Sequence, residues 1–143
     1  LRAMSPLDLA EILEQARLGR RAVERLSAAR ELSIEEAYSV QDEGIRLRGE
    51  AVAGWKMGLT SKAKMKQMGV SVPIMGVLTE PMRVVSGGAL SRAGLIHPRV
   101  EPEVAFILGK DLRGRVSQDE ALEACAGVCA ALEVIDSRFK DAQ

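Results

Sequence analysis

Three glutamates occupy segments that otherwise have the apolar composition of a protein core, and this feature constrains the fold most strongly. Glu101 and Glu103 lie two residues apart in the strand-like run 99–108, and Glu133 lies in the apolar run 130–135. Because residues two apart on a strand point to the same face, Glu101 and Glu103 should share one face. Carboxylates gathered away from water repel one another and need a cation or a partner.

Two interpretations of these glutamates remain open on local spacing alone. Mg²⁺ and Mn²⁺ prefer oxygen ligands, so three carboxylates suit such an ion and leave positions for a chelating substrate. In the structural alternative, Glu101 and Glu103 line an exposed strand face, and Glu133 pairs with Arg99 or Arg138. The balance of 20 basic and 20 acidic residues makes such pairing easy.

Length and composition limit the classes of protein to consider. The 143 residues suffice for about one domain. Apolar residues make up 47% of the chain and aromatic residues only 3%, so aliphatic side chains must build the core. A net charge of zero gives no support for a nucleic-acid or membrane-surface patch, and no run approaches the ~20 apolar residues of a membrane span. These features predict a soluble, cytoplasmic protein that binds neither nucleic acid nor membranes.

The first 50 residues carry the signals of two helices. Ser5 is a suitable cap for a helix that ends near Gly19. Ser33 and Glu36 have the spacing of a capping box and predict a second helix start. We expect this region to serve as a scaffold or a subunit contact.

After residue 50 the pattern changes to short apolar runs separated by glycines. Residues 51–59 predict a buried strand. Thr60 or Ser61 can cap a short helix that closes at Gly69, and a further strand is expected near Val77.

The last third of the chain predicts a strand, a helix and another strand. Residues 100–108 combine β-branched and aromatic residues, which favours a strand. The alanine-rich residues 117–131 indicate a helix, and residues 132–135 a strand entering the same core. Cys125 and Cys129 would share one helix face as packing residues, because no matching Cys or His pair exists for zinc.

Five motifs, in this order and spacing, resemble the hydratase/decarboxylase family of meta-cleavage aromatic degradation. The family includes 2-hydroxypenta-2,4-dienoate hydratase and 4-oxalocrotonate decarboxylase, within the wider fumarylacetoacetate hydrolase superfamily. The motifs are GWKMGLTS at 54–61, AKMKQMGV at 63–70, PIMG at 73–76, HPRVEPE at 97–103 and LEVIDSR at 132–138.

The resemblance implies a role for four of the residues. Glu101, Glu103 and Glu133 occupy the positions of the family's Mg²⁺ or Mn²⁺ ligands, and Lys56 occupies that of its active-site lysine. A partly desolvated lysine can hold a substrate carboxylate or exchange a proton. In the alternative interpretation, Lys56 extends its ammonium from an apolar strand to solvent.

The resemblance also implies a 2-oxo acid substrate. Thr60 and Ser61, which offer hydroxyls, and Ile74 are expected to bind this substrate, whereas His97, beside a proline, is expected in a loop. Hydratase-like relatives carry Pro-Asp-aromatic-Gly where this chain has PIMG, so Ile74 replaces an acid that hydration would use. We therefore expect metal-dependent decarboxylation of 4-oxalocrotonate (2-oxohex-3-enedioate) to 2-hydroxypenta-2,4-dienoate. The alternative activity is that of the hydratase.

The fold implied is α+β. Residues 1–50 form an N-terminal helical region, and residues 51–143 form the first part of a mixed β-roll of the fumarylacetoacetate hydrolase C-terminal type. Because family members continue beyond the last motif, we expect a truncated β-roll. We also expect a homo-oligomer. An alternative assembly is a complex with the hydratase of the same pathway. A non-enzymatic alternative is an inactive fragment or a structural partner subunit.

Overall fold

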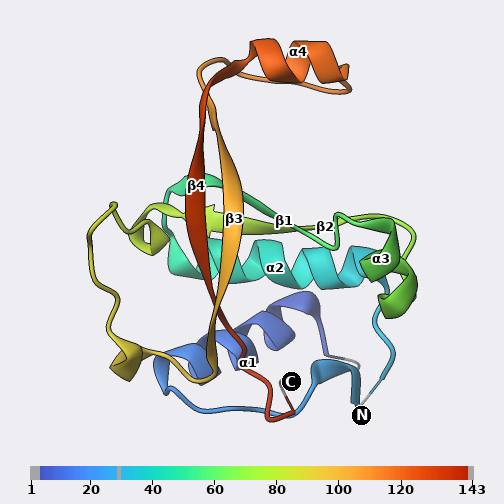
Figure 1. Cartoon of the computed structure of the whole chain (residues 1–143). Helices are drawn as coiled ribbons and strands as arrows, with labels where there is room; N and C mark the ends of the chain where they lie inside the picture. The colour runs from blue at the N-terminus through green and yellow to red at the C-terminus, as the bar shows by residue number, and fades with distance from the viewer. Residues whose placement is uncertain (1–3, 29, 142–143) are drawn as a thin grey trace. The chain divides into compact units, whose positions relative to one another are not determined.

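The computed structural model describes residues 4–28 and 30–141, which form two compact units (Figure 1). The first unit runs to Ile96 and includes the segment from Arg138 onward, and the second is His97–Ser137. The predicted α+β order, with N-terminal helices followed by strands, is confirmed, and the described strands pair antiparallel. The division between residues 50 and 51 stays a prediction.

Two capped helices, α1 (Pro6–Leu18) and α2 (Ile34–Arg48), open the first unit. The Ser5 and Ser33 hydroxyls each accept a hydrogen bond from the backbone N–H three residues on, at 3.2 and 3.1 Å. The acidic side chain at that third position accepts the N–H of the serine in return. Both predicted helices are therefore confirmed, with two otherwise unpaired backbone donors satisfied at each start.

A small apolar core joins the two helices. Leu9 and Ala10 of α1 and Val40 of α2 are buried, and the partly buried Leu13 and Leu32 pack against them. Among the described residues no helix is long and apolar enough to cross a membrane.

A buried ion pair also links α1 to α2. The Glu14 carboxylate accepts hydrogen bonds from Arg48 at 2.5 and 2.8 Å and from Arg17 at 2.7 Å. The side chains of Arg48 and Glu14 are only 8% and 10% exposed. Burial raises the pKa of Glu14, but the hydrogen bonds and positive charges of the two arginines outweigh burial and hold it below its ordinary value.

The first unit also contains an antiparallel pair of strands, β1 (Val52–Gly58) and β2 (Ile74–Thr79). The short helix α3 (Lys62–Met68) connects them, and the Ser61 hydroxyl caps it by accepting the Lys64 N–H at 3.2 Å. Short 3-10 turns occupy Leu26–Ala28, Glu80–Met82 and Arg92–Gly94.

The prediction that the first strand is buried is wrong. Trp55 is 56% exposed, and Met57 on the same face is also exposed. The physical reason is that, among the described elements, α2 provides the main packing against this two-stranded sheet, at β2. One face of β1 therefore stays open.

The second unit is a long antiparallel ribbon of β3 (Pro98–Leu108) and β4 (Cys125–Asp136), with helix α4 (Gln118–Glu123) between them at one end (Figure 1). The predicted strand at residues 100–108 is confirmed. The predicted helix at residues 117–131 is wrong beyond Glu123, because the following residues pair with β3 along its whole length.

Local sequence helps to explain this error. Gly127 and Val128 are poor helix formers, and both pair with residues of β3 instead. Cys125 and Cys129 consequently lie on a strand and not on a helix face. Both are free thiols; Cys125 is half-buried and Cys129 is exposed.

Candidate functional site

The three glutamates meet on one face of the β3–β4 ribbon. Glu101 pairs directly with Glu133 across the strands, and Glu103 lies two residues further along β3. One carboxylate oxygen from each glutamate lies within 4.8 Å of the corresponding oxygens of the other two. The sequence predicted the shared face of Glu101 and Glu103, and the strand register adds Glu133 to it.

The alternation of the two strands separates the glutamates from a row of apolar side chains on the opposite face. Residues between the glutamates point to the opposite face, where Pro102 pairs with Leu132. A two-stranded ribbon has an unpaired edge on each strand, so it tolerates the missing N–H of this proline. The apolar side chains on the opposite face are Val100, Val104, Phe106, Val128, Leu132 and Val134.

The donor set and its spacing fit a hard divalent cation. Oxygen atoms bound to one Mg²⁺ at about 2.1 Å lie no more than about 4.2 Å apart, so small side-chain rotations would close the group. Glu101 and Glu103 make no side-chain hydrogen bond or ion pair with any other described residue. A cation would replace the mutual repulsion of the three carboxylates by attraction. Pairing of Glu133 with Arg99 or Arg138 stays a prediction.

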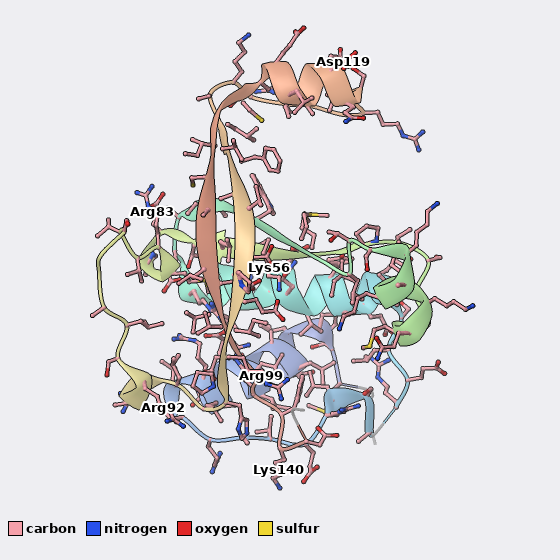
Figure 2. The ribbon with its side chains drawn as sticks, in the orientation of Figure 1. Lys56, Arg83, Arg92, Arg99, Asp119 and Lys140 are labelled. Atoms are coloured by element: carbon pink, nitrogen blue, oxygen red, sulfur yellow. The ribbon has the colours of Figure 1, made fainter. Side chains whose placement is uncertain are left out.

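Lys56 lies on one face of the β1–β2 ribbon, half-buried and opposite Gly76 (Figure 2). Gly58 and Ile74, the pair two residues along, share this face. The stem of Lys56 passes over Gly76, since a Cβ atom added at Gly76 would lie 2.9 Å from the Lys56 Cγ. The missing side chain of Gly76 therefore leaves the space that the lysine stem occupies.

The predicted substrate-binding residues are distributed around the same ribbon. Ile74 packs over Gly58, where an added Cβ would lie 3.0 Å from its Cγ1. Thr60 and Ser61 follow β1 and are exposed, after a turn in which Leu59 adopts a φ of 55°. The Ser61 hydroxyl oxygen serves α3 as its cap. The substrate-binding roles of Ile74, Thr60 and Ser61 stay predictions.

Two polar residues of α2 support this ribbon and were missed in the sequence. The Tyr38 hydroxyl accepts the Met75 N–H at 3.0 Å, and the Gln41 Oε1 accepts the Val77 N–H at 3.2 Å. Their i, i+3 spacing on a helix is the only local signal that they face the same neighbour. Which strand they support depends on tertiary structure.

His97 precedes β3 at a bend, as its neighbouring proline suggested. Its backbone N–H donates to the Asp136 Oδ1 at 2.6 Å, and its ring Nε2 is buried without a hydrogen-bond partner among the described residues.

Lys56 belongs to the first unit and the three glutamates to the second. Their meeting in one pocket stays a prediction.

Comparison with known proteins assigns the chain to a family, although no family model matches it. A 4-oxalocrotonate decarboxylase of Pseudomonas sp. is 43% identical over 136 residues, which are 93% of this chain and 53% of that protein. A 2-hydroxyhexa-2,4-dienoate hydratase of Comamonas testosteroni is 40% identical over 139 residues, covering 86% of this chain and 53% of the relative. The chain belongs to the hydratase/decarboxylase family.

The solved structures agree with this family assignment. The 4-oxalocrotonate decarboxylase from Pseudomonas putida G7, complexed with magnesium and adipate, matches with a TM-score of 0.88 and 36% identity. The match covers 99% of this chain and 57% of that one, and a second structure of the same enzyme is complexed with calcium and acetate. The predicted family and fold class are thereby confirmed. The chain spans about half the length of the relatives that it matches.

Proposed function

We propose that this chain carries the metal-binding part of a decarboxylase that acts on 4-oxalocrotonate. The observation that carries the proposal is the group of Glu101, Glu103 and Glu133, which brings one oxygen from each carboxylate within 4.8 Å of the others on one face of a ribbon. Support comes from the family member of the same fold that is complexed with magnesium. The ion proposed here is Mg²⁺ or Mn²⁺, because both take oxygen ligands.

The chemistry divides between the ion and the side chains. A divalent cation acts as a Lewis acid, which draws electrons toward the 2-oxo group of the substrate. The three glutamates hold that ion and leave room for the substrate's 1-carboxylate and 2-oxo oxygens. Decarboxylation breaks the bond from C5 to the far carboxylate carbon, and the electron pair moves through the conjugated system to the 2-oxygen.

Lys56 has two possible tasks in this reaction. Its ammonium can hold the departing carboxylate by a charge-assisted hydrogen bond, or it can deliver the proton that completes 2-hydroxypenta-2,4-dienoate. The exposed hydroxyls of Thr60 and Ser61 are proposed to bind the substrate. In this proposal the protein is a cytoplasmic homo-oligomer, alone or assembled with the hydratase of the same pathway.

Ile74 favours decarboxylation over hydration. Adding water requires a group that positions or deprotonates the water molecule, and an aliphatic side chain provides none. Hydration remains the second candidate, because a 2-hydroxypent-2,4-dienoate hydratase of Pseudomonas putida is 41% identical over 140 residues. A third candidate is a non-catalytic chain that acts as a structural partner.

The test is to supply the metal-loaded chain separately with 2-oxohex-3-enedioate and with 2-hydroxypenta-2,4-dienoate. We expect metal-dependent release of CO₂ from the first compound and no consumption of the second. Replacing Glu103 by glutamine should abolish the release, whereas Glu123→Gln, a change at an exposed residue of α4, should preserve it. Water addition to the second compound without CO₂ release would support the hydratase, and no turnover of either would support the structural partner.

A further inference from the structure

We propose that Gly76 is a positioning residue for Lys56, and that its missing side chain fixes where the lysine ammonium lies. This inference rests on the proposed role of Lys56 in the active site. Gly76 is the direct partner of Lys56 across the β1–β2 pair. A Cβ atom at Gly76 would lie 2.9 Å from the Lys56 Cγ and 3.3 Å from its Cδ. The first distance is too short for two carbon atoms that are not bonded.

The clash would displace the whole lysine side chain because it occurs at Cγ, close to the backbone. The Cγ atom of a lysine moves only when χ1 changes, so it cannot yield by a small motion at the flexible end of the chain. Side chains occupy separate staggered rotamers, and a different χ1 redirects the entire stem. A methyl group at position 76 would therefore move the ammonium and not merely compress its contacts.

The backbone below the lysine has little freedom to retreat. The residues on either side of Gly76 donate their N–H groups to α2, Met75 to the Tyr38 hydroxyl and Val77 to the Gln41 Oε1. The same Gln41 Oε1 would lie 3.8 Å from the added Cβ. Strand β2 is thus tied to a helix on both sides of the glycine, and the lysine is the part that must shift.

Gly54 provides a matched control on the same face of the ribbon. It lies two residues before Lys56, and a Cβ atom added there meets nothing within 4 Å. Both glycines lie on strands, so replacement by alanine changes backbone entropy similarly at each. Only at position 76 does the new methyl group meet the lysine.

The experiment compares Gly76→Ala with Gly54→Ala in the full chain by NMR. In the native protein we expect cross-peaks between the Lys56 γ-protons and the α-protons of residue 76. The cross-peaks should disappear in Gly76→Ala, with a changed Lys56 Cε chemical shift, and should persist in Gly54→Ala. Cross-peaks and a Cε shift that are unchanged in Gly76→Ala would overturn the inference.

A second variant keeps the test decisive if Gly76→Ala unfolds. Removing the clashing stem in the double variant Lys56→Ala, Gly76→Ala should then restore the folded state seen by circular dichroism. A double variant that stays unfolded would contradict the inference.

Measuring kcat of Gly76→Ala distinguishes a failure of this inference from a failure of the proposed function. A displacement of the ammonium by about 1 Å can reduce kcat by about 10²-fold when the lysine takes part in the reaction. NMR evidence of displacement with undiminished kcat would leave Gly76 as a positioning residue and remove Lys56 from the mechanism.

Discussion

The α1–α2 pair and the β3–β4 ribbon differ in how each segment holds its structure. The helices bury Leu9 and Val40 together with the ion pair of Glu14 and Arg48. The ribbon is held by backbone pairing, while Phe106 and Leu132 on its apolar face are 60% and 72% exposed. An isolated pair of strands is only marginally stable in water. Stability should therefore depend on side chains in the helices and much less on those of the ribbon.

The largest effect should come from breaking the buried ion pair. Arg48→Ala leaves Glu14 buried with only Arg17 beside it, and we expect the free energy of unfolding to fall by about 3–5 kcal/mol. Urea denaturation monitored by helical circular dichroism measures this change. Arg46→Ala is the matched control, because Arg46 pairs with Glu43 on the exposed side of α2 and its loss should cost about 0.5 kcal/mol. Equal losses in the two variants would remove the special role of the buried pair.

The smallest effect on the free energy of unfolding is expected from a leucine-to-alanine change on the β3–β4 ribbon. The same change in the core between α1 and α2 serves as the comparison. Leu132→Ala should change the free energy of unfolding by no more than about 0.5 kcal/mol, because its side chain is already exposed. Leu9→Ala, at a position that is 5% exposed, should cost about 2–5 kcal/mol. Thermal and urea unfolding of the two variants would show the difference. A larger loss from Leu132→Ala than from Leu9→Ala would reverse the comparison.

The sequence alone predicted the features that depend on nearby residues. The capping boxes at Ser5 and Ser33 predicted both helix starts, because all their hydrogen-bonding groups lie within four residues. The alternation around Glu101 and Glu103 likewise predicted a strand and a shared face. In these cases the local chemistry and the final structure agree.

Features set by distant residues were less predictable. The alanine-rich run after Glu123 has helical composition, but pairing with β3 makes it a strand. Local spacing left the grouping of Glu133 with the other two glutamates as one of two interpretations, and the family resemblance favoured that grouping. The contact between Lys56 and Gly76 depends on the register of β1 with β2, and nothing local to either residue specifies that register.

The most direct test of the central claim is a calorimetric titration of this chain with Mg²⁺. If Glu101, Glu103 and Glu133 form the metal site, the chain binds one Mg²⁺, Glu103→Gln loses that binding, and Glu123→Gln keeps it. Circular dichroism should show that both variants remain folded, because the exposed Glu103 makes no ion pair among the described residues. Equal Mg²⁺ binding by the native chain and Glu103→Gln would contradict the account, as would a folded native chain that binds no Mg²⁺.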